Sequence, residues 1–383
     1  MKSILIRDST LREGMELPGV ELSLRDKVKI ARILDDMNVR EIEIGMPYGI
    51  KSCVPLAKAV KSEGMKIKTS ALIISYRSNW KEDIDIAAEA GIDRIEILVP
   101  TSDILLNLKD YYKIKKQEIP GLLHETVGYA KKRLKGVGLG FVDATRTNPD
   151  FLLRLMKEAG DCGAERVIIY DTVGIASPPM MTKLVSRIKR KSPVPILIHC
   201  HNDFGLATAN SLAGIIAGAE AVDVVANGLG DRGGNAPFEE VVLALEILHG
   251  IKTGIKLEKI SEFSKMVEEK SGIRKCRVKP VVGEFTFLHS PVMHIRNAAS
   301  GNRKGFEPFA PELIGAERKF AFTLPVDYSD ALEPFCKKLG AEPDKDQKAS
   351  ILKVLRTESK DTGLSEKQVL NLISKSIVMK KKR

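Results

Sequence analysis

The chain has 383 residues, 43% hydrophobic and 29% charged, a balance ordinary for a globular protein long enough for one large domain and a smaller one. No apolar run reaches the ~18 residues of a membrane span, and the five scattered cysteines form no CxxC pair, so we expect a cytoplasmic protein with reduced thiols and no membrane contact. The net charge of +11 with only 5% aromatic residues favours an anionic small substrate over a nucleic acid.

The first 250 residues repeat one unit, in which a short β-branched run and a turn precede an amphipathic helix. Strands are predicted at Ser3–Arg7, Glu41–Gly45, Lys66–Ile74, Arg94–Val99, Val137–Val142, Arg166–Tyr170, Ile196–His199 and Ala221–Ala226. Helices are predicted near 23–38, 52–63, 80–90, 122–135, 148–161, 178–191, 205–217 and 237–249. Eight successive strand–helix units favour an α/β fold of the closed TIM (β/α)8 barrel type over a doubly wound open sheet.

The repeat ends near residue 250. We therefore predict a barrel over 1–250, a linker over 251–328 and a small, mainly helical C-terminal region over 329–383. Residues 251–280 read as one helix, and residues 281–328 are rich in Pro and Gly without a regular pattern. Helical periodicity returns at Asp330–Leu339, Lys345–Glu358 and Ser365–Ser376.

In a barrel the chemistry lies just after the C-terminal end of each strand, so catalytic and binding residues are expected at those positions. Arg12 and Glu13 follow the first strand. Arg12 is suited to pair with a carboxylate or polarise a ketone, and Glu13 is a candidate metal ligand. A surface turn with an ion pair inside the loop is the alternative interpretation of this segment.

Two histidines end the seventh strand. Because alternate residues of a strand share a face, His199 and His201 point into the same space, with a spacing typical of a metal site. In a closed ring, Glu13 would lie only two strands away. Two histidines hydrogen-bonded near a strand end would give the same pattern without a metal.

Two further segments follow strands six and eight. Thr172 could donate a hydrogen bond to a substrate carboxylate, or could simply form a turn. The segment Asn227–Asn235 contains four glycines, which let the backbone approach a ligand closely, and enters a helix whose N-terminus suits an anion.

Together these segments resemble the family of isopropylmalate, homocitrate and citramalate synthases, TIM-barrel acyltransferases that condense acetyl-CoA with a 2-oxo acid in carboxylic-acid or amino-acid biosynthesis. The resemblance covers residues 1–250, and His289 and His294 match a linker element of the family more loosely. The matching segments, in the order of the family, are Asp8–Gly14, Asp143–Arg146, Asp171–Gly174, His199–Ala207 and Asn227–Asn235.

The resemblance implies a role for each matching residue. Glu13, His199 and His201 would bind a divalent metal ion (Mn, Zn, Co or Mg), with Asn235 as a further ligand or as a support to the ligands. Arg12 would steady the 2-oxo acid and its developing alkoxide, and Thr172 would hold the carboxylate. His289 would take part in proton transfer, in the family often from the partner subunit of a homodimer.

Several positions depart from the family pattern. Val142 stands where a glutamate is usual, Gly140 where a serine is common, and Phe306 where a tyrosine is expected. Homocitrate synthases have an arginine near Gly138, and a histidine is frequent at the position of Leu105. Glu16 replaces a glutamine. Gly138, Gly140 and Leu105 predict a roomier, less polar substrate pocket, which weakly disfavours 2-oxoglutarate.

The sequence therefore predicts a metal-dependent Claisen-type condensation of an acyl-CoA with a 2-oxo acid. A metal-dependent lyase or aldolase on the same barrel is the first alternative, because the acid–base residues are altered. Cys276 lacks the glycine-rich loop that acyl-CoA lyases carry after strand eight. A non-catalytic or partner-dependent subunit is the second alternative, although Arg12, Glu13 and both histidines speak against it.

Overall fold

The computed structural model describes residues 4–49, 52–108, 112, 114–192 and 194–381. They divide into two compact units, a barrel unit (Met1–Lys256 with Phe263–Arg274) and a C-terminal unit (Leu257–Glu262 with Lys275–Arg383). The division of the sequence into three parts at residues 250 and 328 stays a prediction.

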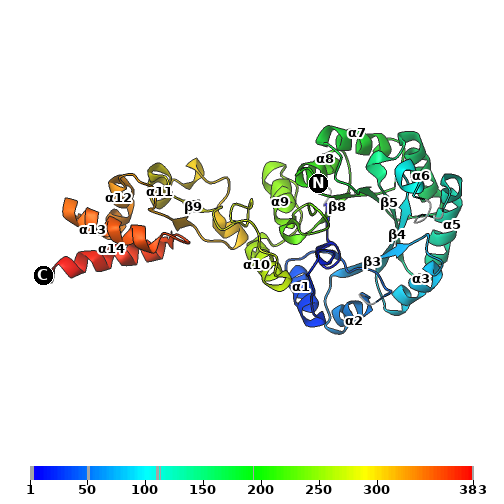
Figure 1. The fold of residues 1–383 in the computed structure, drawn as a ribbon, viewed down its shortest axis with the longest axis horizontal. Coiled ribbons are helices and arrows are strands. Elements are labelled where there is room, and N and C mark those ends of the chain that lie inside the picture. The colour runs from blue at the N-terminus through cyan, green and yellow to red at the C-terminus, as the bar shows by residue number, and fades with distance from the viewer. Residues whose placement is uncertain (1–3, 50–51, 109–111, 113, 193, 382–383) are drawn as a thin grey trace. The chain divides into compact units, whose positions relative to one another are not determined.

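Eight parallel strands close a barrel in chain order, and the predicted TIM barrel is confirmed (Figure 1). Strand β1 pairs with both β2 and β8, which closes the ring. All eight predicted strands are present, although Ser3 of the first lies outside the described residues. The strands are β1 (Leu5–Asp8), β2 (Glu41–Glu43), β3 (Lys68–Ile74), β4 (Arg94–Pro100), β5 (Gly136–Val142), β6 (Val167–Asp171), β7 (Ile196–Cys200) and β8 (Ala221–Val224).

Helices surround the ring because each has one apolar stripe to bury against the strands (Figure 1). Several begin at a side-chain cap, as where Ser23 accepts a hydrogen bond from the backbone N–H of Asp26. The helix expected near 122–135 starts earlier because Pro120 occupies its first turn. The barrel helices are α1 (Leu24–Asp36), α2 (Val54–Ser62), α3 (Trp80–Glu89), α4 (Asp103–Leu106), α5 (Ile119–Ala130), α6 (Pro149–Asp161), α7 (Pro178–Lys189), α8 (Ala207–Ile216) and α9 (Phe238–Leu243).

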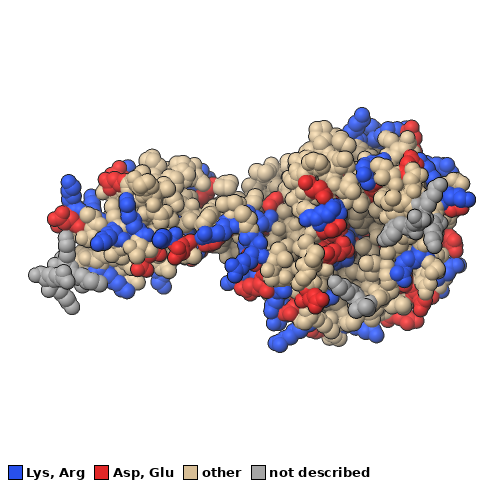
Figure 2. All heavy atoms as spheres, in the orientation of Figure 1, with Lys and Arg blue, Asp and Glu red and all other residues tan. Residues whose placement is uncertain are grey.

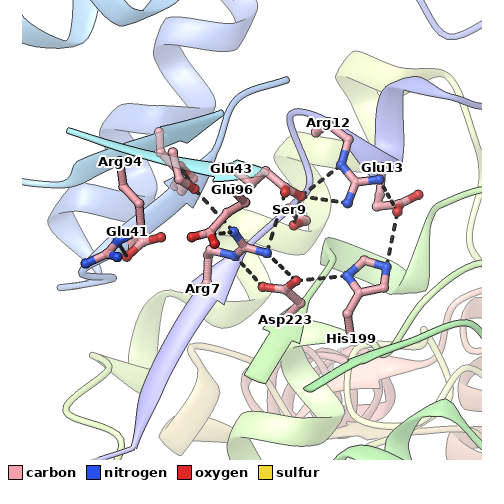
Figure 3. A network of polar contacts seen from close by, with 12 residues as sticks. Arg7, Ser9, Arg12, Glu13, Glu41, Glu43, Arg94, Glu96, His199 and Asp223 are labelled. Carbon is pink, nitrogen blue, oxygen red and sulfur yellow. Dashed lines mark hydrogen bonds and ion pairs between the residues drawn. The ribbon is translucent and has the colours of Figure 1, made fainter. Parts of the chain in front are cut away.

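A buried ion-pair network runs through the inside of the barrel (Figure 3). At the strand starts, Arg166 contacts Glu96 and Glu41 through Nε and Nη1, at 2.7 and 3.0 Å. Toward the strand ends, Arg7 grips both carboxylate oxygens of Asp223 at 2.5 and 2.6 Å. Arg7 also lies 3.8 Å from Glu96, so the two ends are linked. An apolar group packs beside these charges: Leu5, Leu98, Ile168, Tyr170, Leu197 and Ala221.

The C-terminal unit has its own core, in which Phe320, Phe322, Tyr328 and Phe335 are fully buried. Three two-residue strands form a small sheet in the order β11-β10-β9. Residues 281–328, which showed no regular pattern in the sequence, contain one α-helix, two short 3-10 helices and two of these strands. The elements are β9 (Leu288–His289), α11 (Val292–Ala299), β10 (Lys319–Phe320), α12 (Ser329–Lys338), α13 (Lys345–Glu358), β11 (Leu364–Ser365) and α14 (Glu366–Lys381). Helix α10 (Ile260–Ser271) crosses the division between the units.

On the face of the barrel unit seen in Figure 2, lysines and arginines are interspersed with acidic residues and do not form one continuous basic surface. Within the described part of the chain, no helix is long and apolar enough to cross a membrane. All five cysteines are free.

Candidate active site

Three potential metal ligands meet at the C-terminal mouth of the barrel. Glu13 begins a short 3-10 helix, Glu13–Met15, in the loop after β1, His199 lies in β7, and His201 follows that strand. All three side chains are buried, and their ligand atoms lie within 4.8 Å of one another. The Nε2 atoms of His199 and His201 lie 3.2 and 3.8 Å from Glu13 Oε1. The structure therefore brings together the three residues that the sequence assigned to a metal.

The ring of His199 is oriented by a carboxylate on the neighbouring strand. Asp223 Oδ2 lies 2.9 Å from Nδ1 of His199, which directs Nε2 toward Glu13 (Figure 3). A carboxylate behind a histidine in this way is typical of metal sites, where it fixes the tautomer. Burial alone would lower the pKa of His199, but the hydrogen bonds with Asp223 and Glu13 raise it to about 9.

The other two ligands differ in charge. Burial would raise the pKa of Glu13, but Arg12 and the two histidines hold it well below its usual range, so this carboxylate stays ionised. Burial and the neighbouring His199 lower the pKa of His201 to about 3, so its imidazole is neutral. An ionised carboxylate and a neutral imidazole are the forms that bind a divalent cation.

Unsatisfied polar atoms test whether a cation fits here. Glu13 Oε2, His201 Nδ1 and Asn235 Oδ1 are buried and have no hydrogen-bond partner. Leaving such an atom unpaired costs about 1–3 kcal/mol, so their concentration at one place indicates that a ligand completes the site. Two imidazoles, a carboxylate and an amide oxygen are donors that Zn, Mn or Co accept readily.

Asn235 reaches this cluster because of the glycine-rich loop. The loop returns to β7, where His201 and Asn235 form an isolated bridge, and Asn235 Nδ2 lies 3.1 Å from His199 Nε2. Gly230 has a φ of +140°, and a Cβ atom there would lie 1.9 Å from Asn235 Oδ1. Only glycine therefore allows Asn235 to take this position.

The helix that follows the loop does not offer the anion site expected from the sequence. Its first turn carries Glu239 and Glu240, and Glu239 accepts a hydrogen bond from the backbone N–H of Asn227. The negative charges of these two side chains in the first turn disfavour an anionic ligand there.

Arg12 is held rigidly beside the metal ligands. Its Nε donates to Glu43 Oε2 at 2.8 Å, and its Nη1 contacts Glu13 (Figure 3). Glu43 is itself fixed by the hydroxyl of Ser9 at 2.6 Å. Burial opposes the charge of Arg12, but Glu13 and Glu43 raise its pKa well above the usual value, so the guanidinium stays charged.

Thr172 follows β6 and faces the same mouth. Its Oγ1 accepts a hydrogen bond from the backbone N–H of Asp143 at 2.8 Å, so the hydroxyl hydrogen remains free to donate. Its carbonyl oxygen accepts from Nη2 of Arg232 at 2.7 Å, which ties this turn to the glycine-rich loop.

His289 belongs to the C-terminal unit. It is buried, and its Nε2 lies 2.9 Å from Glu307 Oε1, while Arg318 grips the other oxygen of Glu307 at 2.6 Å. His294 is less buried, and its ring stacks on Phe306 with the ring centroids 3.8 Å apart.

Residues 3–267 match the family model described as HMGL-like. The chain belongs to this family. A putative (R)-citramalate synthase of Archaeoglobus fulgidus is 38% identical over 99% of this chain and 76% of the relative. A 2-isopropylmalate synthase of Methanocaldococcus jannaschii is 39% identical over 90% of this chain and 65% of the relative. A homocitrate synthase of the same organism is 35% identical over 100% of this chain and 93% of the relative.

Two solved structures are examples of those similar to this chain in fold. An HMG-CoA lyase of Bacillus subtilis aligns with a TM-score of 0.62 and 24% identity, over 71% of this chain and 95% of that one. The carboxyl transferase domain of Rhizobium etli pyruvate carboxylase aligns with a TM-score of 0.57 and 16% identity, over 80% of this chain and 54% of that one. At these identities the similarity concerns the fold alone.

Three further residues of this site were not predicted from the sequence. Asp223 orients His199, Glu43 holds Arg12, and Tyr170 lies with its ring centroid 4.6 Å from that of His199. Each stands on the inward face of a buried strand, where a charge or a hydroxyl is unusual. The sequence did contain a sign of such residues, because Glu41 and Glu43 are alternate residues of β2 and therefore point to the same face of the strand.

The expectation of a roomier pocket at Gly138 and Gly140 is wrong. A Cβ atom at Gly138 would lie 2.0 Å from Glu96 Oε2, and one at Gly140 would lie 2.8 Å from Cε2 of Tyr170. Side chains from the neighbouring strands β4 and β6 fill the space that the glycines leave.

Three basic residues of the barrel unit, Lys68, Arg77 and Arg146, do not take the place of the arginine that homocitrate synthases have near Gly138. Lys68 starts β3, at the end of the barrel away from Glu13. Arg77 lies 3.4 Å from Asp83, and Arg146 donates to both oxygens of Asp143 at 2.8 and 3.0 Å. Thus one of the three is remote and two already have carboxylate partners.

Proposed function

We propose that this protein joins the acyl group of an acyl-CoA, acetyl-CoA in the first instance, to the oxo carbon of a 2-oxo acid and releases CoA. The observation that carries the proposal is the buried cluster in which Arg12 adjoins Glu13, His199 and His201. Relatives named as citramalate, isopropylmalate and homocitrate synthases, 35 to 39% identical, confirm the predicted class of condensing acyltransferases.

Glu13, His199 and His201 would hold a divalent cation, with Asn235 beside them. When bound, such a cation supplies Lewis-acid chemistry at the oxo and carboxylate oxygens of the acceptor. Asp223 keeps Nε2 of His199 directed at this position, and the buried ion pair with Arg7 keeps Asp223 in place.

Arg12 and Thr172 would bind the acceptor. As the oxo carbon is attacked, its oxygen becomes negative, and the charged Arg12 stabilises that oxygen without having to reorganise, because Glu43 already fixes it. The free hydroxyl hydrogen of Thr172 would donate to the acceptor's carboxylate.

The bonds change in two stages. A base takes a proton from the carbon next to the thioester carbonyl, and the electron pair left there forms the new bond to the oxo carbon, whose oxygen then gains a proton. Water next adds to the thioester, which releases the CoA thiol and leaves a carboxylate.

Two groups are candidates for proton transfer. His289, in the C-terminal unit, is oriented by Glu307 and is the candidate that the family resemblance implies. Glu16, which replaces the family's glutamine, is 44% exposed and lies 3.6 Å from Arg12 at the barrel mouth, where Val142 offers no carboxylate.

The variant Glu16→Gln, which restores the glutamine, distinguishes the two candidates. A large loss of kcat would assign the proton to Glu16, whereas an unchanged kcat together with an inactive His289→Ala would assign it to His289.

The alternatives account for fewer observations. The similar solved structures include a lyase, but at their sequence identities they establish the fold and not the reaction. Cys276 lies in the C-terminal unit, in an exposed position without a glycine-rich loop. A non-catalytic role would leave the buried, unpaired atoms of Glu13, His201 and Asn235 without a purpose.

Carbon-13 in both acetyl carbons of acetyl-CoA tests the proposed reaction. The product expected is a single acid containing the 2-oxo acid, both labelled carbons and one added water. Recovery of the label only as acetate, or only in unreacted acetyl-CoA, would reject the condensation.

A homodimer and a cytoplasmic location belong to this proposal as well, because they rest on the family resemblance and on the cysteine pattern. Sedimentation of the full chain tests the first, with a mass of twice 42.2 kDa expected for the particle.

A further inference from the structure

Tyr170 is the side chain at the barrel mouth whose position none of the roles above explains. It is 6% exposed, and its hydroxyl is buried with no hydrogen-bond partner. It stands opposite His199 in the β6–β7 register, and the two ring centroids are 4.6 Å apart. A buried hydroxyl without a hydrogen-bond partner destabilises the folded protein by about 1–3 kcal/mol. A ligand that accepts a hydrogen bond from Tyr170 would remove this cost.

The ring of Tyr170 takes the space above Gly140. A Cβ atom on that glycine would lie 2.8 Å from Tyr170 Cε2 and 2.7 Å from Leu98 Cδ2, distances that no real side chain keeps. Glycine in β5 and tyrosine in β6 are therefore a matched pair. The wall of the site comes from β6, and it is bulky and mostly apolar.

The charged groups around Tyr170 also favour an acceptor with an uncharged side chain. A phenol hydroxyl carries its hydrogen at neutral pH, so Tyr170 is a hydrogen-bond donor. A second carboxylate on the acceptor would need a cation near this wall. The cations that act electrostatically on Tyr170 are Arg12 and Arg7. Arg12 is assigned to the reacting oxygen, and Arg7 is fully buried and paired with Asp223, so neither is available to a second carboxylate. Arg77 and Arg146 bind carboxylates of their own, and Lys68 lies at the other end of the barrel.

We propose that Tyr170 is the specificity-determining residue of the acceptor pocket, and that it restricts the acceptor to a 2-oxo acid with a short, uncharged side chain, such as pyruvate. This rests on the proposed condensation. The ring excludes branched or longer side chains, and the hydroxyl donates a hydrogen bond to an oxygen of the bound acid.

Substitution of Tyr170 tests this through the choice of acceptor. We expect wild type to have a higher kcat/KM for pyruvate than for 2-oxoisovalerate or 2-oxoglutarate. Tyr170→Ala should lower the ratio of pyruvate to 2-oxoisovalerate by about 10-fold or more, the scale of small changes in an apolar pocket. Tyr170→Phe keeps the ring, so the ratio should stay while kcat/KM for pyruvate falls by up to about 10-fold, as for one lost hydrogen bond.

Leu197→Ala is the matched control. Leu197 belongs to the same apolar group inside the barrel and is fully buried, but it lies two residues before His199 in β7. Its truncation should lower stability without changing the acceptor ratio. If Tyr170→Ala does not fold, Tyr170→Leu keeps apolar bulk and shortens the side chain, and the same shift in ratio is expected.

Calorimetric binding of the acids with Mn²⁺ separates this inference from the proposed function. Wild type should bind pyruvate more tightly than the other acids, and Tyr170→Ala should weaken the binding of pyruvate selectively. This result would support the inference even if no CoA thiol were released, because the absence of thiol release would overturn only the condensation. Turnover or binding that favours 2-oxoisovalerate or 2-oxoglutarate in wild type, or an unchanged ratio in folded Tyr170→Ala and Tyr170→Leu, would overturn the inference. Absence of any acid binding would overturn both.

Discussion

Arg12 reaches the barrel mouth with its guanidinium already fixed by Glu43 and Glu13. A donor held in place before the reaction stabilises a developing oxyanion by about 3 kcal/mol, so Arg12→Ala should lower kcat by roughly 100-fold or more while the metal stays bound. Steady-state kinetics with a metal assay on the same sample check this. Arg12→Lys keeps the charge without the fork-shaped donor set and should recover only part of the rate. A loss of kcat below about threefold in Arg12→Ala would make Arg12 structural.

Asp8 predicts a dependence of stability on pH. It is fully buried, and burial raises its pKa to about 7, although hydrogen bonds from Thr10 oppose the shift and nearby Asp223 and Glu239 reinforce it. The folded state thus holds a proton that the unfolded state loses above about pH 4. The stabilisation is complete below the unfolded pKa and is lost as pH rises toward about 7, by at most about 1.4 kcal/mol per pH unit.

Asp8→Asn removes this titration. Urea unfolding of wild type and Asp8→Asn between pH 4 and pH 7 should show the difference in free energy of unfolding move in favour of the variant as pH rises. A difference that stays constant over this range would place the pKa of Asp8 near its ordinary value.

At the scale of residues, the sequence was informative where chemistry follows a strand end. Glu13, His199 and His201 could be placed together because the ends of parallel strands share one face of a barrel. Asp223 and Tyr170 could not, because their roles depend on which inward side chains of neighbouring strands meet. The same limit explains Gly140, since a missing side chain predicts space only when the neighbour's side chain is known.

Among the elements, the loop between β8 and α9 sets the position of Asn235. Gly230→Ala would place a Cβ atom 1.9 Å from Asn235 Oδ1, so the loop must shift. We expect weaker divalent-metal binding in this variant, measured by calorimetry. Gly218→Ala is the control, because Gly218 also has a positive φ, +113°, but a Cβ there meets only Lys189 at 3.3 Å or more. Its metal affinity should equal that of wild type, and equal affinity in Gly230→Ala would exclude Asn235 from the metal site.

Long, periodic elements were predictable and short ones were not. Helical periodicity located α13 at the observed bounds, Lys345–Glu358. The strands β9, β10 and β11 have two residues each, too few to show an alternation, and so they left no pattern in the sequence.

Across the barrel as a whole, Arg7 joins several strands. It binds Asp223 in β8 and lies within 3.5 and 3.8 Å of Glu43 and Glu96 in β2 and β4. Removing one partner leaves buried carboxylates uncompensated, so Arg7→Ala should lower the free energy of unfolding by about 3–5 kcal/mol. Urea unfolding measures this. Arg32→Ala breaks an ion pair with Glu63 that is 41 and 43% exposed and should cost at most about 1 kcal/mol. Equal losses in the two variants would contradict a central role for Arg7.

The release of CoA thiol from acetyl-CoA, with Mn²⁺ and pyruvate, glyoxylate, oxaloacetate, 2-oxoisovalerate or 2-oxoglutarate, tests the condensing site most directly. We expect wild type to release thiol with at least one acid and not without it, and folded His199→Ala and His201→Ala to bind no metal and release none. Thiol release by these variants at the wild-type rate, or no release by metal-loaded wild type with any of the acids, would contradict the account.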